Sequence, residues 1–196
     1  MHPAIEAALE LQEFLDHHGQ RFCIIGGLAV QRWGEVRLTV DADATVLTDW
    51  VRDEFVTDLL LGSPFAPRRA DAREFALKNR VLLLKNKMGT HVDVALGAMD
   101  FENRSVLRSS LWKISPETNL RTCSAEDLLV HKTFAGRSRD WTDVEGILQR
   151  QGGKLDLALV RRELGPLLEL KDAPEAMDRL AALCRTNGLG FPNPAG

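Results

Sequence analysis

Two aspartates separated by one residue, Asp41 and Asp43, are the side chains whose spacing most directly suggests chemistry. They belong to residues 37–47, where apolar and polar residues alternate for part of the length, a pattern typical of a strand with one face toward the core. Side chains two apart on a strand point to the same face, so the two carboxylates are expected side by side. Adjacent carboxylates repel unless a cation lies between them, and hard oxygen ligands suit Mg²⁺ or Mn²⁺. The pair therefore indicates a divalent metal site, with a solvated strand face as the alternative.

A pair of glycines, Gly26 and Gly27, precedes these aspartates. The apolar run Phe22–Ile25 is typical of a short buried strand, and residues 28–33 have the pattern of a short helix. The glycines are therefore expected to form a tight turn between the two elements. Exposed amides in such a turn, together with the N-terminus of the helix, can bind phosphate without a steric penalty. The alternative is an ordinary tight turn with no ligand.

A third aspartate, Asp93, lies between two valines in His91–Leu96, which has the composition of a core strand. Residues Lys85–Thr90, with Gly89 in the turn, are predicted to join this strand to the apolar run Val81–Leu84 as a hairpin. A carboxylate in a core strand is costly unless it is paired or bound to a metal. Asp93 is therefore a candidate third metal ligand, and a local hydrogen bond at a strand edge is the alternative.

From Ser124 onward the sequence is predicted to be helical. Ser124 and Asp127, three residues later, resemble a capping box at the start of the first helix. Three further helices are expected after it, at residues 140–150, 155–164 and 174–185. Asp140 is expected to cap the second helix of this region. The chain is thus predicted to divide into an α+β core, residues 1–122, and a helical C-terminal region, residues 123–196.

The composition is that of a globular protein, with 44% hydrophobic and 27% charged residues in a chain of 196. The net charge of −3 gives no indication of a strongly basic nucleic-acid binder. Two local stretches are basic, Pro64–Arg69 and Lys85–Lys87; each is either a contact for an acidic polymer such as tRNA or a solvated surface. The three cysteines fit no zinc motif, and no apolar stretch approaches the ~20 residues of a membrane span. A cytoplasmic protein with reduced thiols and no membrane contact is expected.

Taken together, Gly26-Gly27, the short helix, the Arg-x-Thr-x-Asp-x-Asp run at residues 37–43 and the later strand with Asp93 resemble the nucleotidyltransferase superfamily. The resemblance is closest to the minimal bacterial nucleotidyltransferases of the abortive-infection (AbiEii/AbiGii-like) toxin group, and it covers about residues 20–150. It implies an α+β fold in which a nucleotidyltransferase-like mixed sheet is flanked by helices. A helical C-terminal region would follow the sheet and complete the active site.

The resemblance also implies roles for the residues of the core. Gly26 and Gly27 would face the triphosphate of a nucleoside triphosphate (NTP). Asp41 and Asp43 would hold magnesium or manganese, and Asp93 would be the third carboxylate and help to activate the incoming hydroxyl group. The chemistry is consistent, because two metals about 4 Å apart can stabilise the attacking and leaving oxygens of an in-line displacement at the α-phosphate.

Other charged residues match the family pattern less closely. The resemblance implies that Lys132, on the first C-terminal helix, is a point charge on the triphosphate and that Arg137 or Arg139 adds to it. Asp143 would orient Lys132 or lie near the base. Arg37 and Thr39, which begin the aspartate motif, are assigned to the nucleotide site. The alternatives are solvated charges for Lys132 and Arg139, and a structural hydrogen bond or ion pair at the start of the strand for Arg37 and Thr39.

Three functions follow as hypotheses. The resemblance favours a magnesium-dependent toxin-type enzyme that transfers NMP from an NTP to a hydroxyl group of tRNA or of a cognate antitoxin protein. The second is a small-molecule, antibiotic-type adenylyltransferase; a deep acidic acceptor pocket would favour it, whereas a basic groove beside the site would favour RNA. The third is a catalytically weak module that binds nucleotide or protein, which the presence of all three aspartates opposes. The preferred NTP and the oligomeric state are not encoded in residue spacing.

Overall fold

A computed structural model describes residues 2–192. The chain forms two compact units, which we call the sheet unit and the helical unit. The sheet unit comprises Met1–Leu28 and Leu38–Cys123, and the helical unit comprises Ala29–Arg37 and Ser124–Gly196. The chain therefore leaves the sheet unit within one helix, α2 (Gly26–Trp33), and returns to it directly before the aspartate pair. Within the described range, no helix combines the length and apolarity needed to cross a membrane.

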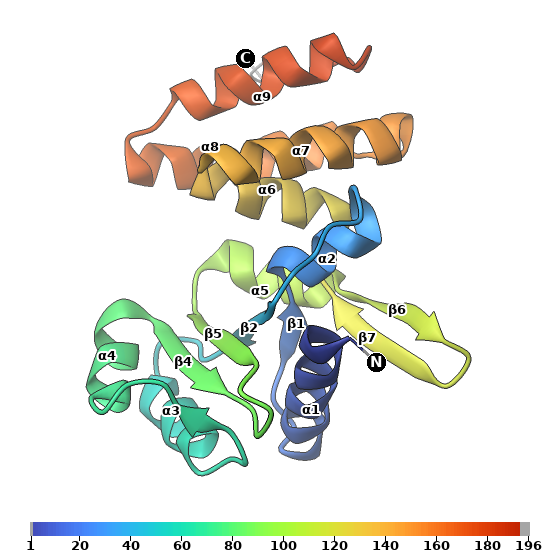
Figure 1. Cartoon of the computed structure of the whole chain (residues 1–196). Helices are drawn as coiled ribbons and strands as arrows, with labels where there is room; N and C mark the ends of the chain where they lie inside the picture. The colour runs from blue at the N-terminus through green and yellow to red at the C-terminus, as the bar shows by residue number, and fades with distance from the viewer. Residues whose placement is uncertain (1, 193–196) are drawn as a thin grey trace. The chain divides into compact units, whose positions relative to one another are not determined.

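The sheet unit is built on a mixed sheet with the strand order β3-β4-β5-β2-β1-β7-β6 (Figure 1). Its strands are β1 (Phe22–Ile24), β2 (Asp41–Leu47), β3 (Ala66–Pro67), β4 (Val81–Lys85), β5 (His91–Gly97), β6 (Ser110–Ser115) and β7 (Thr118–Thr122). The central strands β2 and β5 are parallel, and each has an antiparallel neighbour on its other side, β1 and β4 respectively. This order places the two strands that carry the three candidate aspartates next to each other.

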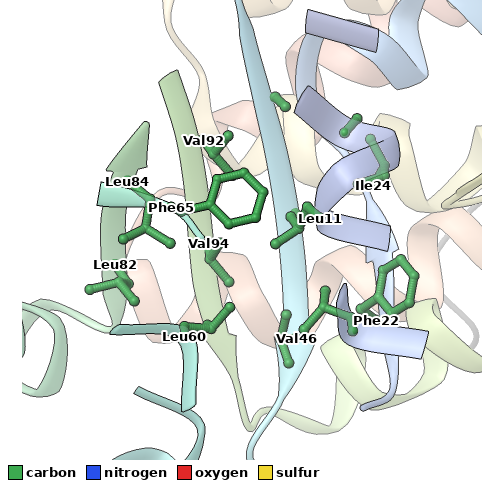
Figure 2. Close-up of a cluster of buried hydrophobic side chains, with 14 of the residues drawn as sticks. Leu11, Phe22, Ile24, Val46, Leu60, Phe65, Leu82, Leu84, Val92 and Val94 are labelled. Atoms are coloured by element: carbon green, nitrogen blue, oxygen red, sulfur yellow. The ribbon is translucent and has the colours of Figure 1, made fainter. Parts of the chain in front are cut away.

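The hydrophobic core of the sheet unit lies on one face of these strands. Alternate residues of β2, β4 and β5 are buried there, as the two-residue period of a strand requires. Helix α1 (Pro3–His17) packs its small and apolar side chains against this face, and α3 (Asp53–Leu61) and α4 (Ala72–Asn79) add to the same cluster. Figure 2 shows members of the cluster from several elements, among them Leu11 of α1, Phe65 before β3, and Val92 and Val94 of β5. The other face of the same strands is left for polar side chains.

The helical unit consists mainly of α6 (Ala125–Ala135), α7 (Ser138–Gln151), α8 (Leu157–Lys171) and α9 (Glu175–Thr186), with a short 3-10 turn at Gly152–Lys154. Helix α6 contacts the other three helices and is buried around most of its circumference. Ser124 caps α6 by accepting a hydrogen bond from the Asp127 amide at 3.1 Å, which confirms the predicted start of this helix. Asp140 accepts from the Arg137 amide at 3.2 Å, as predicted for a residue that caps α7.

Several element predictions need correction. The strand expected at residues 37–47 begins only at Asp41, because the Arg37 carbonyl accepts a hydrogen bond from the side chain of Gln31 at 3.1 Å and does not join the sheet. The glycine pair forms the first turn of α2 and not a separate tight turn before it. The pattern of residues 49–61 predicts a helix, but Asp49 and Trp50 have positive φ angles of 51° and 62°, so α3 starts only at Asp53.

Several further elements were not predicted, among them strand β3 and helix α4. Residues 98–110, whose structure the sequence left open, contain helix α5 (Asp100–Arg108), and strand β7 follows β6 as an antiparallel partner. By contrast, the predicted hairpin formed by β4 and β5 is confirmed.

Candidate active site

The three candidate aspartates lie on neighbouring strands of the sheet unit. In the parallel register of β2 and β5, Asp43 lies opposite Asp93 and Asp41 lies opposite His91. All four residues are on the face of the sheet that points away from the core, because the residues between them, such as Ala42 and Val92, are fully buried. We call this side of β2, β5 and β4 the polar face. The sequence predicted that Asp41 and Asp43 share a face, and the register adds Asp93 to it.

The glycine pair approaches the aspartate strand closely. A Cβ atom on Gly26 would lie 2.0 Å from Oδ2 of Asp43, and one on Gly27 would lie 2.3 Å from Oγ1 of Thr39. Gly26 also has a φ angle of +60°, which favours glycine for backbone reasons. The N-terminal turn of α2 is therefore packed directly against the carboxylate strand, which only residues without side chains permit.

Thr39 orients the first aspartate. Its hydroxyl group donates a hydrogen bond of 2.9 Å to Oδ1 of Asp41, and the threonine itself is only 3% exposed. Thr39 thus has the structural hydrogen bond that was the alternative to nucleotide binding.

Asp93 forms an ion pair with Arg68, a residue that was not among the predicted site residues. The two side chains are 32% and 21% exposed, respectively, so the pair is partly buried. Burial raises the pKa of the Asp93 carboxyl group above its ordinary value, and the negative charge of Asp41 raises it further. The positive charge of Arg68 lowers this pKa but does not cancel the rise. The effect of Asp41 on this pKa reflects the closeness of the two carboxylates. The basic stretch Pro64–Arg69 was the sequence signal for Arg68, but it did not indicate that one of its arginines reaches Asp93.

The donor atoms at this site are those that a divalent cation of the Mg²⁺ type prefers, namely carboxylate oxygens from three neighbouring positions. Because Gly26 has no Cβ atom, the Asp43 carboxylate occupies the space where one would lie. In residues 2–192, no three His, Cys, Asp or Glu side chains converge as a ready metal site. The hydrogen bonds explain part of this, because Asp41 is bonded to Thr39 and Asp93 to Arg68. The residues fit a metal by type and register, and the carboxylates of Asp41 and Asp93 each keep lone pairs that their present hydrogen bonds do not use.

A second cluster of charges lies in the helical unit. Arg37 donates two hydrogen bonds to Asp143, at 2.7 and 2.8 Å, and Lys132 lies 2.8 Å from the same carboxylate and 3.1 Å from Asp140. Burial opposes ionisation of Asp143, whose side chain is 2% exposed, but the hydrogen bonds from Arg37 and Lys132 outweigh it and hold its pKa below the ordinary value. The Asp143 carboxylate therefore contacts Lys132. Arg37 forms an ion pair with the same carboxylate, and a structural ion pair was the alternative to a place for Arg37 in the nucleotide site.

The structure thus groups the predicted residues into two sets. Gly26, Gly27, Thr39, Asp41, Asp43 and Asp93 belong to the sheet unit, whereas Arg37, Lys132, Asp140 and Asp143 belong to the helical unit. Arg139 also belongs to the helical unit, where it is exposed on the first turn of α7.

A cavity of about 430 Å³ also lies in the sheet unit, between α1 and the segments around Phe65 and Lys87. Its lining includes Glu10, Phe14 and His17 but none of the three candidate aspartates. This cavity is therefore separate from the candidate active site.

No protein-family model matches the chain. No curated protein matches it either. Among solved structures, the solution structure of the antibiotic-resistance factor ANT(2'')-Ia aligns with 89% of this chain and 96% of its own, at a TM-score of 0.52 and 13% identity. A crystal structure of an antigenic nucleotidyltransferase-like protein from Paracoccidioides brasiliensis covers 89% of this chain and 92% of its own, at a TM-score of 0.48 and 17% identity.

The chain therefore has the predicted fold class, a nucleotidyltransferase-like α+β fold with a mixed sheet flanked by helices. At 13% identity, the likeness to ANT(2'')-Ia concerns the fold. The chemistry has to be argued from the residues of the site.

Proposed function

We propose that this protein is a magnesium-dependent nucleotidyltransferase, which transfers NMP from an NTP to a hydroxyl group. The observation that carries the proposal is the register of the central strands, which sets Asp43 opposite Asp93 and keeps Asp41 on the same face. Three acids on one face of a sheet are hard to explain as structural residues, because like charges at this spacing repel. A nucleotidyltransferase-like fold with this constellation supports nucleotidyl transfer as its use.

In the proposed reaction, Asp41 and Asp43 hold magnesium or manganese with Asp93 as the third carboxylate. When bound, the metal neutralises charge on the phosphates and on the attacking and leaving oxygens. The acceptor hydroxyl oxygen forms a bond to the α-phosphorus, and the bond from that phosphorus to the pyrophosphate oxygen breaks. Asp93 takes up the hydroxyl proton or orients the group that does so, and pyrophosphate leaves. Backbone amides at Gly26 and Gly27 are proposed to bind the triphosphate at the N-terminus of α2.

The helical unit is proposed to complete the active site. Lys132 would supply positive charge to the triphosphate, with Asp143 and Asp140 fixing its ammonium group through the contacts already described. Arg37 would act through Asp143, and Arg139, on the exposed surface of α7, would add a second cation. These assignments follow the family resemblance of the sequence.

For the acceptor, the resemblance to the AbiEii/AbiGii-like group favours tRNA or a cognate antitoxin protein, as in a toxin–antitoxin pair. The structural likeness to an antibiotic-resistance factor favours a small-molecule adenylyltransferase as the second candidate. A catalytically weak binding module is the third, and the existing bonds of Asp41 and Asp93 to protein side chains favour it. In each case the cytoplasm is the proposed location.

The test is magnesium-dependent incorporation of α-labelled NTP into total RNA and total protein. We expect label in one of the two with the wild-type protein and none with Asp41→Asn/Asp43→Asn, while Asp16→Asn, which changes an exposed aspartate on α1, retains it. Absence of both labelling and Mg-NTP binding by calorimetry would refute the proposal. Binding without labelling of either pool would favour the small-molecule acceptor or the binding module.

A further inference from the structure

The cavity of about 430 Å³ beside α1 has the lining of a small-molecule site. Such sites usually measure roughly 300–1,000 Å³ and combine apolar and aromatic side chains with a few charged or polar groups. Here two aromatic rings, Phe14 and Phe65, are accompanied by two carboxylates, Glu10 and Glu13, and by the ammonium group of Lys87. None of these side chains has a part in the proposed active site, so the cavity calls for a ligand of its own.

One face of α1 forms a wall of the cavity. Glu10, Glu13 and Phe14 are three or four residues apart, so their side chains lie next to one another along the helix. This face adjoins the stripe of small and apolar residues with which α1 packs against the sheet. Phe14 is partly buried against the core, and its ring contacts that of His18 with the centroids 4.3 Å apart. The aromatic part of the wall is therefore held in place by the protein itself.

The turn between β4 and β5 supplies another wall, and Asn86 fixes it. Asn86 is 5% exposed, and its side-chain oxygen accepts hydrogen bonds from the amides of Met88 and Thr90 at 3.1 and 3.0 Å. Its side-chain nitrogen donates to Oε2 of Glu10 at 3.2 Å. Lys87 directly follows Asn86 in this turn and lines the same cavity as Glu10. The bond between Glu10 and Asn86 therefore brings an acidic and a basic side chain to neighbouring parts of the cavity wall.

A free α-amino acid has the charges that this wall complements. Its ammonium and carboxylate groups are attached to one carbon atom, and its side chain extends away from both. The ammonium group matches Glu10 and Glu13, and the carboxylate matches Lys87. A simple amine would leave Lys87 without an anion, and a simple acid would be repelled by the two glutamates. An apolar side chain would pack on Phe14 and Phe65, of which Phe65 is 5% exposed and belongs to the buried cluster in Figure 2.

We propose that this cavity binds a free α-amino acid with an apolar side chain, and that Glu10 and Glu13 bind its ammonium group while Lys87 binds its carboxylate. A residue within a peptide chain carries neither of these charges, and a residue at a chain end carries only one, so the pairing selects the free amino acid. The inference is independent of the proposed function, because none of the candidate aspartates lines the cavity.

The test is isothermal titration calorimetry of the whole protein with L-phenylalanine. Glu10→Gln keeps an oxygen that can accept the bond from Asn86 but removes the charge. This change and Lys87→Gln should each weaken binding about five-fold, as the loss of one ion pair at the protein surface does. The matched controls are Glu117→Gln, in the turn between β6 and β7, and Lys78→Gln, on α4; both residues are exposed and lie outside the cavity lining. The controls should bind as the wild type does, and thermal unfolding without ligand should show all four variants folded.

Three related compounds test which groups of the ligand are recognised. L-Phenylalaninamide lacks the carboxylate, N-acetyl-L-phenylalanine lacks the ammonium group, and L-serine has both charges but no apolar side chain. Each should bind more weakly than L-phenylalanine does. Lys87→Gln should reduce the preference for L-phenylalanine over its amide, and Glu10→Gln should reduce the preference over the N-acetyl compound.

Two sets of results would overturn the inference. The first is no binding of L-phenylalanine by the wild type at millimolar concentration, or equal binding by Glu10→Gln, Lys87→Gln and the controls. The second is binding of the amide or the N-acetyl compound as tightly as L-phenylalanine, which would assign the cavity to a simple amine, a simple acid or a chain end. Asp41→Asn/Asp43→Asn should bind L-phenylalanine as the wild type does, so a failure of this inference is distinguishable from a failure of the proposed function.

Discussion

At the scale of single residues, the candidate site depends on close contacts that most side chains would prevent. Gly26 shows this most clearly, because the space where its Cβ atom would lie is taken by the Asp43 carboxylate. Gly19 provides a comparison, since its φ angle of +61° almost equals the +60° of Gly26 but a Cβ atom added to it would have nothing within 4 Å. A comparison of substitutions at the two glycines therefore distinguishes the effect of backbone strain from the effect of contact with Asp43.

Gly26→Ala is expected to destabilise the protein more than Gly19→Ala and to abolish Mg-NTP binding. Both substitutions place alanine in the left-handed region, at a cost of about 1–2 kcal/mol, but only the first also displaces Asp43. Chemical denaturation and calorimetry with Mg-NTP would measure the two effects. Equal stabilities and intact Mg-NTP binding in both variants would show that the contact between Gly26 and Asp43 has no role in the site.

The Arg68–Asp93 pair predicts a pH effect of defined sign. Removing Arg68 removes a charge that lowers the pKa of Asp93, so the raised pKa of this carboxyl group should rise further in Arg68→Gln. A carboxyl group with a raised pKa in the folded state adds stability below its unfolded pKa and loses that contribution as the pH rises through the folded pKa. Relative to the wild type, Arg68→Gln should therefore be least stable near neutral pH and recover as the pH falls.

Carbon-13 NMR titration of the aspartate carboxyl groups in metal-free buffer would measure this shift directly. Arg69→Gln is the control, because Arg69 pairs with Asp71 and leaves the Arg68–Asp93 pair in place. An unchanged pKa of Asp93 in Arg68→Gln would contradict the ion pair.

At the scale of elements, one buried carboxylate connects three segments of the helical unit. Asp143 on α7 receives hydrogen bonds from Arg37, in the segment that follows α2, and contacts Lys132 on α6. Arg37 and Asp143 are 106 residues apart in sequence, so this contact closes a long stretch of chain. The contact therefore ties the segment that follows α2 to α6 and α7 within the helical unit.

Asp143→Asn is expected to lower the free energy of unfolding by about 3 kcal/mol at neutral pH, because it leaves the buried Lys132 and the partly buried Arg37 with a neutral partner. The pKa of Asp143 is lowered in the folded protein, so its contribution is present above the unfolded pKa and is lost as the pH falls through the folded value. The difference between variant and wild type should therefore shrink in acid. Urea denaturation at several pH values would measure it.

Glu145→Gln is the control for this substitution, since Glu145 is an exposed acid on the same helix. Its effect should stay within about 0.5 kcal/mol at every pH. A difference between Asp143→Asn and wild type that does not change with pH would contradict the assigned role of the carboxylate charge.

At the scale of the whole molecule, the three candidate aspartates belong to the sheet unit, whereas Lys132 and Arg139 belong to the helical unit. A ligand that binds the folded protein and not the unfolded chain stabilises the folded state. At a free concentration of 100 times the dissociation constant, a single-site ligand adds about 2.7 kcal/mol to the free energy of unfolding.

We expect Mg-NTP to raise the melting temperature of the wild-type protein and EDTA to reverse the rise. Asp41→Asn/Asp43→Asn should lose the effect, and Asp16→Asn should keep it. Scanning calorimetry with NTP alone, magnesium alone and both together would measure it. A rise of the same size in the double variant would exclude the two aspartates as the metal site.

The sequence by itself determined the local elements whose periodicity is strong. Alternation around Asp41 predicted a strand with both aspartates on one face, and the apolar runs of β4 and β5 predicted a hairpin. The start of α6 followed from Ser124, whose side chain competes for the free amides of a helix end. These features depend on interactions between residues only a few positions apart, so the order of residue types along the sequence predicts them directly.

Only the tertiary structure decided which distant residues meet. The parallel register that sets Asp43 opposite Asp93 depends on how two strands 50 residues apart align. The approach of Gly26 to Asp43, the reach of Arg68 across β4 and the bond between Arg37 and Asp143 depend on packing in the same way. Residue periodicity predicts which side chains share one face of a strand, but it does not predict which strand pairs with it. Strand pairing and long-range ion pairs are set by the burial of the whole core and not by local propensity.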